Sequence, residues 1–153
     1  MRWSHYSKGH CGIRLHFDGN LLRKGKAGCI EEVNYSENRV NIDNPLDPFS
    51  KKSQEEYKKL LLTKSQVWNY ECEYRLFLPP KECFHKRNMS FTKFNPNSLI
   101  RIDIGLNCNT EREIKKQLRR EDLKHVKLFR AEIDPNKFKL NYKQIDLNDD
   151  ESK

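Results

Sequence analysis

Apolar and polar residues alternate in several stretches of the chain, and this alternation predicts β-strands. In the first stretch, Ile13, Leu15 and Phe17 alternate with Arg14 and His16, which is the two-residue period of a strand with one buried face. Strands are predicted on this basis over residues 12–17, 29–35, 68–78, 99–104, 126–133 and 137–145. The stretch over 68–78 ends at two consecutive prolines, and we expect it to be a central strand.

Two other segments have helical spacing. Residues 53–64 begin with a serine, a residue that often caps helices, and carry Tyr57, Leu60 and Leu61 at three- and four-residue intervals. A second helix is expected over residues 110–120. Turns or loops are predicted at residues 18–20, 37–53, 105–109 and 134–136, where turn-forming residues replace the periodic pattern.

These elements predict an α+β fold with about six strands and two helices. The sheet should be mostly antiparallel, because most of the predicted connections contain no crossover helix. The length of 153 residues fits one domain, and no segment has the composition of a linker. We therefore expect a single domain over residues 1–147 and a polar tail over residues 148–153.

Composition limits the classes of protein to which the chain can belong. Hydrophobic residues make up only 35%, and no stretch approaches the roughly 18 apolar residues that a membrane-spanning helix needs. The first residues lack the apolar run of a signal peptide, so we expect a cytoplasmic protein without a membrane partner. The five cysteines include no C-x-x-C pair, which favours reduced thiols and predicts no metal site.

The predicted strand over residues 68–78 carries the first candidate site. Glu71 and Glu73 stand two residues apart and should share one face of the strand, with Arg75 next on that face. Two close carboxylates beside a guanidinium can supply one ionised and one protonated group for acid/base chemistry. A Glu-x-Glu pair is also what NAD-using transferases place against the nicotinamide ribose, which makes NAD a candidate substrate. The alternative is a solvated row of ion pairs.

Aromatic and imidazole side chains near the start form the second candidate site. Trp3 and Tyr6 can stack on a nucleotide, while His5 and His10 can donate hydrogen bonds or titrate near neutral pH. Alternatively, the aromatic side chains anchor the core and the histidines cap backbone carbonyls.

The net charge of +8 raises nucleic acid as a third candidate ligand. Basic residues are dense over 112–124, but Glu111, Glu113 and Glu121 lie among them. A solvated helix with intrahelical ion pairs explains most of this pattern.

Two motifs together resemble one bacterial family. The first is Trp3-x-His5-Tyr6 followed by His10 and Gly12, and the second is Trp68-x-x-Glu71-x-Glu73-Tyr74-Arg75. Their joint pattern is similar to that of domain-of-unknown-function family 2971, over residues 1 to about 145. The resemblance implies that this basic protein lacks an N-terminal part that family members carry. It names a family without an established activity.

Three functions remain open. The first is an enzyme, or the remnant of one, that acts on a nucleotide-like substrate such as NAD; here Glu73, Glu71 and His5 would be catalytic. Its substrate-binding residues would be Trp3, Tyr6, His10 and Arg75. The alternatives are a non-catalytic module that binds nucleic acid and a purely structural or interaction domain.

Overall fold

The computed structural model describes residues 2–23, 28–42 and 50–148, which divide into two compact units. The larger unit combines residues 1–25 with 92–153, and the smaller unit consists of residues 26–91. No helix among the described residues is long and apolar enough to cross a membrane.

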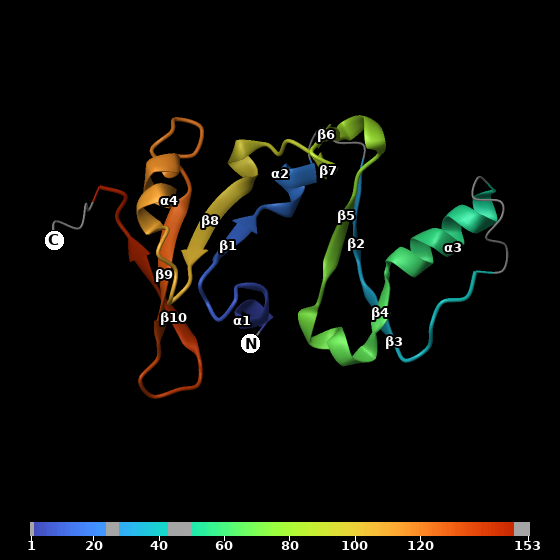
Figure 1. The fold of residues 1–153 in the computed structure, drawn as a ribbon, viewed down its shortest axis with the longest axis horizontal. Coiled ribbons are helices and arrows are strands. Elements are labelled where there is room, and N and C mark those ends of the chain that lie inside the picture. Colours follow the sequence, from blue (N-terminus) through green and yellow to red (C-terminus); the bar gives the residue numbers. More distant parts are fainter. Residues whose placement is uncertain (1, 24–27, 43–49, 149–153) are drawn as a thin grey trace. The chain divides into compact units, whose positions relative to one another are not determined.

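A four-stranded sheet forms the centre of the larger unit (Figure 1). Its order is β1 (Ile13–Phe17), β8 (Leu99–Ile104), β9 (Lys127–Ile133) and β10 (Leu140–Ile145). Strands β1 and β8 are antiparallel, as are β9 and β10, whereas β8 and β9 are parallel. Parallel neighbours need a crossover connection, and α4 (Glu111–Leu118) lies in the chain between β8 and β9.

Helix α4 packs on one face of this sheet. Ile102, Ile104 and Leu128 from the strands form the hydrophobic core with Leu118 of α4. Arg130, which follows Leu128 on the same face of β9, donates two hydrogen bonds to Glu111 at the start of α4. Because side chains alternate along a strand, residues 101 and 103 of β8 face away from α4.

Two short helices flank β1 in the sequence. They are α1 (Arg2–Tyr6) and α2 (Gly19–Arg23), and a 3-10 turn, η3 (Pro96–Ser98), precedes β8. The loop between α1 and β1 approaches the end of β8 closely, since the backbone N–H of Gly105 donates to the Gly12 carbonyl at 3.0 Å. A Cβ at residue 105 would lie 2.0 Å from the His10 carbonyl oxygen, so only glycine fits there.

The smaller unit contains three two-stranded sheets and one longer helix. Strands β2 (Cys29–Glu32) and β5 (Tyr74–Phe77) pair antiparallel, whereas β3 (Asn34–Ser36) and β4 (Thr63–Ser65) pair in parallel. Helix α3 (Lys51–Leu61) begins after Ser50, whose hydroxyl accepts from the Ser53 backbone N–H. The remaining elements are the 3-10 helices η1 (Gln66–Glu71) and η2 (Pro80–Glu82) and the hairpin β6 (Phe84–Lys86) with β7 (Met89–Phe91).

The α+β class is confirmed, but the expected six strands and two helices are not. The described residues form four α-helices and ten strands in four small, mostly antiparallel sheets. The additional strands have three residues each and the additional helices five, which is too short for two strand periods or two helical turns. The predicted strand over 29–35 is two strands, because it is interrupted at Val33. The predicted turn at 18–20 is the start of α2, where Asp18 accepts hydrogen bonds from the Asn20 and Leu21 N–H groups.

The prediction of a central strand over residues 68–78 is wrong. Its first part is η1, Cys72 has a positive φ of 44°, and only Tyr74–Phe77 forms a strand, in a two-stranded sheet. The predicted helix over 53–64 begins and ends earlier, as α3 (Lys51–Leu61). The polar tail lies outside the described residues from 149 onward, as do residues 43–49 of the predicted loop.

Candidate functional site

A fully buried carboxylate, Asp103, lies on the face of the larger sheet opposite α4. Because β1 pairs with β8, Arg14 lies directly across from it and donates from Nε at 3.0 Å and from Nη2 at 2.5 Å. Arg101 donates from Nε at 2.5 Å, and His16 Nε2 lies 2.7 Å from the carboxylate. Burial raises the pKa of Asp103, but the hydrogen bonds from Arg101, Arg14 and His16 outweigh burial, and the pKa is below its ordinary value. Asp103 is therefore ionised at neutral pH.

The guanidinium groups held by Asp103 lie against aromatic rings. The Arg14 guanidinium carbon is 5.1 Å from the ring centroid of Trp3 and 4.9 Å from that of Tyr142. That of Arg101 is 3.8 Å from the Phe129 centroid and 5.2 Å from the Tyr142 centroid. These are distances at which a cation is attracted to the face of an aromatic ring.

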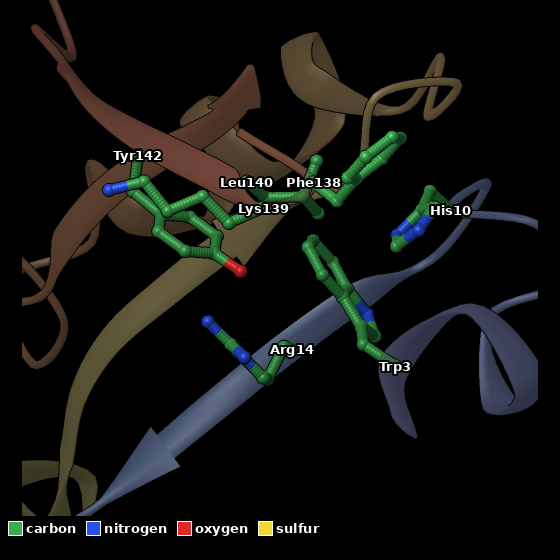
Figure 2. A pocket seen from close by; sticks show the side chains of 7 residues that line it. All are labelled: Trp3, His10, Arg14, Phe138, Lys139, Leu140 and Tyr142. Carbon is green, nitrogen blue, oxygen red and sulfur yellow. The ribbon is translucent and has the colours of Figure 1, made fainter. Parts of the chain in front are cut away.

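A hollow of about 270 Å³ opens beside Arg14 (Figure 2). We call it the Trp3–Tyr142 pocket; it is lined by Trp3, His10, Arg14, Phe138, Lys139, Leu140 and Tyr142. The rings of Trp3 and His10 meet edge to face at 5.2 Å, and Trp3 and Tyr142 are 6.3 Å apart. The walls are thus largely aromatic and aliphatic, and Arg14 and Lys139 supply positive charge.

The loop between α1 and β1 positions His10. Lys8, Gly9 and His10 all have positive φ angles, of 48°, 70° and 68°. The buried hydroxyl of Ser7 donates to the Trp3 carbonyl at 2.7 Å and accepts from the His10 backbone N–H at 3.1 Å. The Asn107 backbone N–H donates to the His10 carbonyl at 3.0 Å. These bonds connect Trp3 and His10 to one another and to the segment that follows β8.

The smaller unit contains the predicted pair of carboxylates. Lys64 of β4 donates to Glu71 and, at 3.2 Å, to Glu73, and Arg75 donates from Nε to Glu73 at 2.7 Å. The Glu71 side chain is buried, whereas that of Glu73 is 30% exposed. The Glu73 backbone N–H donates to the Tyr35 hydroxyl at 2.8 Å.

Hydrogen bonds within this cluster keep Glu73 and Lys64 in their charged forms at neutral pH. The Arg75 hydrogen bond lowers the pKa of Glu73, and Lys64 adds to this effect against the cost of burial. The hydrogen bond to Glu71 raises the pKa of Lys64 above its ordinary value. Glu73 is therefore an ionised carboxylate, suited to stabilising positive charge rather than to donating a proton.

The predicted site residues fall into both units. Trp3 and His10 line the pocket in the larger unit, whereas His5 and Tyr6 are exposed on α1 and do not line it. Glu71, Glu73 and Arg75 meet around Lys64 in the smaller unit. Within the described residues, no group of three or more His, Cys, Asp or Glu side chains is arranged to hold a metal ion.

Several residues of the two clusters were absent from the predicted site. They are Arg14, Arg101, Asp103, Phe129 and Tyr142 in the larger unit and Lys64 in the smaller one. The alternation of the strands shows that Arg14 shares a face with His16. Only the pairing of β1 with β8 shows that Asp103 is next to both Arg14 and His16.

Comparison with known proteins identifies a family for the first half of the chain. Residues 2–76 match the model of a family described as a protein of unknown function, DUF2971, the family that the two motifs resemble. The match includes Trp3, His10 and Arg14 of the pocket but ends before Tyr142. No curated protein and no solved structure matches the chain.

Proposed function

We propose that this chain, in which residues 2–76 are a partial DUF2971 domain, binds a nucleotide-like ligand in the Trp3–Tyr142 pocket. The observation that carries the proposal is the placement of Arg14. Its guanidinium is held by a buried carboxylate and lies close to both the Trp3 and the Tyr142 rings. Flat heterocycles stack on aromatic and guanidinium planes, and each stacked base contributes about 1–3 kcal/mol.

The size and charge of the pocket suit one nucleotide. Its volume of about 270 Å³ lies just below the range of about 300–1,000 Å³ that is usual for ligand pockets, so it accommodates one heterocyclic ring rather than a complete dinucleotide. Lys139, half-exposed and 3.5 Å from Asp134, is a second cation at the pocket wall. Together with Arg14 it can meet a phosphate group.

Thermal unfolding with and without millimolar NAD or AMP tests this proposal. A ligand that binds only the native state raises Tm, so both nucleotides should raise it for the unchanged chain. The increase should disappear in Trp3→Ala and in Tyr142→Ala. It should persist in Phe84→Ala, which removes a half-exposed aromatic ring in the smaller unit. An unchanged Tm, or an equal increase in Trp3→Ala, overturns the proposal.

As a second candidate we propose an enzyme that cleaves a nucleotide-like substrate such as NAD at the nicotinamide ribose. Glu73 is ionised, and Lys64 holds Glu71 beside it. An ionised carboxylate stabilises the positive charge that develops on the ribose as the bond to nicotinamide breaks with its electron pair. Water then adds to the ribose carbon and releases a proton. Arg75 would hold the carboxylate in place.

Release of nicotinamide from NAD, measured by chromatography, tests the second candidate. Glu73→Gln should abolish release while the unfolding transition remains. The matched control is Glu121→Gln, because Glu121 also pairs with a lysine, Lys124 at 2.6 Å, but belongs to the larger unit. If the unchanged chain releases no nicotinamide, or if Glu73→Gln stays fully active, the enzymatic proposal is wrong.

A further inference from the structure

The sheet face opposite α4 is both basic and aromatic. Alternation and the strand register place one set of side chains on it: Arg14 and His16 of β1, Arg101 and Asp103 of β8, Lys127 and Phe129 of β9, and Tyr142 and Gln144 of β10. From α1, Trp3 lies against Arg14 and Tyr142 of this set. The Trp3–Tyr142 pocket is at one end of the face.

Basic side chains extend across the strands away from the pocket, with positive charge on Arg101 and Lys127. His16, Arg101 and Lys127 are register partners on three adjacent strands. Neighbouring strands lie about 4.8 Å apart, so this row spans on the order of 10 Å. Asp103 is the one acidic side chain among these eight strand residues, and it is fully buried. The exposed part of the face therefore attracts a partner with several negative charges in a row.

Flat side chains are interleaved with these charges. Arg101 covers the Phe129 ring at 3.8 Å and also approaches Tyr142, which in turn lies 4.9 Å from Arg14. The Arg14 and Arg101 side chains are about one third exposed, so each is open to solvent. Successive unpaired bases stack on such alternating aromatic and guanidinium planes.

We propose that the ligand of this face is a single-stranded nucleic acid, with one base in the Trp3–Tyr142 pocket and its backbone along the row His16, Arg101 and Lys127. This inference rests on the proposed nucleotide-binding function and extends it from one nucleotide to a strand. A double helix keeps its base faces stacked internally and cannot use the aromatic positions. An acidic peptide could meet the charges but has no bases to stack on the rings.

Fluorescence anisotropy with a labelled oligouridylate of eight nucleotides tests the proposal, with UMP as competitor. The oligonucleotide should bind at least tenfold more tightly than UMP, and a double-stranded RNA of equal length should bind more weakly. Lys127→Ala should weaken oligonucleotide binding without changing UMP binding. It should also reduce the slope of log K against log salt by about 0.7, the value for one phosphate contact with a single strand.

The matched control is Lys143→Ala. Lys143 is an exposed lysine on β10, whose side chain is on the face that α4 covers. It should leave oligonucleotide binding unchanged. Three results overturn the strand proposal and leave the nucleotide pocket in place, provided that UMP binds. The oligonucleotide binds no more tightly than UMP, the duplex binds as tightly as the single strand, or the two lysine variants weaken oligonucleotide binding equally. If neither UMP nor the oligonucleotide binds, both proposals fall.

Discussion

Arg14 and Asp103 face each other across the β1–β8 pair, and one carboxylate oxygen of Asp103 accepts from both Nε and Nη2 of Arg14. The same arginine lies close to the rings of Trp3 and Tyr142. The carboxylate thus fixes the orientation of a flat cation at the wall of a pocket. The Asp103 carboxylate that positions Arg14 is also a buried charge, so a change at Asp103 should affect both the stability of the fold and the binding of a ligand in the pocket.

Replacing Asp103 by asparagine should destabilise the larger unit strongly. The substitution leaves Arg14 and Arg101, each about one third exposed, without their anion, and the loss of these charged hydrogen bonds should cost about 1–3 kcal/mol. Urea unfolding followed by circular dichroism measures the loss. The control is Asp122→Asn, because the Arg120–Asp122 pair is exposed and should contribute less than about 1 kcal/mol. Equal losses in the two variants would contradict this account.

The stability of the larger unit should decrease in acid. The pKa of Asp103 and that of Glu111 both lie below their ordinary values in the folded chain; burial opposes this, but cationic partners prevail. A lowered pKa contributes stability above the unfolded-state value, about 4, and this contribution is lost as pH falls through the folded-state value. When urea unfolding is measured from pH 7 to pH 3, the midpoint concentration of urea should therefore decrease once the pH is below about 4. Asp103→Asn should make this decrease smaller. An equal decrease in the variant would show that Asp103 does not cause the loss of stability in acid.

Lys64 should matter far more for folding than Lys58 does. Lys64→Met removes the ammonium group from the buried Glu71 carboxylate and leaves that charge without its cation, so it should destabilise the smaller unit clearly. Lys58→Met breaks the exposed pair with Glu31, which water screens, and should change stability little. Denaturant midpoints of the two variants give the comparison. Equal midpoints for the two variants would show that the Lys64 cluster contributes little to folding.

Gly105→Ala should displace the loop that holds His10. The new methyl group would lie 2.0 Å from the His10 carbonyl oxygen and 2.8 Å from that of Gly12, so the backbone must move. We expect reduced stability and loss of the Tm increase with AMP. Gly19→Ala is the control, since a Cβ there meets no atom within 4 Å. If AMP still raises the Tm of Gly105→Ala, the position of this loop does not matter for binding in the pocket.

The elements that the sequence predicted correctly have a clear period. The strands β1, β8, β9 and β10 and the helices α3 and α4 were all expected close to their observed positions. The prediction of one strand over residues 68–78 failed because apolar and polar residues alternate there, although the chain turns at Cys72 with a positive φ. Trp68, at the start of this segment, is 43% exposed. Glu71 and Glu73 nevertheless converge, since both contact Lys64.

The pocket could be predicted only in part. Trp3 and His10 are close in sequence, and their chemistry alone suggested a binding site. Arg14 meets Asp103 across 89 residues of chain, and Tyr142 reaches Arg14 only through the order of the four strands. The local sequence pattern does not predict the order of strands in a sheet, so neither the Arg14–Asp103 contact nor the Arg14–Tyr142 contact could be inferred.

The most direct test of the central claim uses Trp3 as a reporter. The chain has two tryptophans, so Trp68→Phe leaves Trp3 as the single indole. Titration of this variant with AMP should change its fluorescence in a saturable way, because a base stacked in the Trp3–Tyr142 pocket contacts the indole. The change should be abolished when Tyr142→Ala is added. A titration with no saturable change, or one that is unaffected by Tyr142→Ala, would contradict the claim that this pocket binds nucleotides.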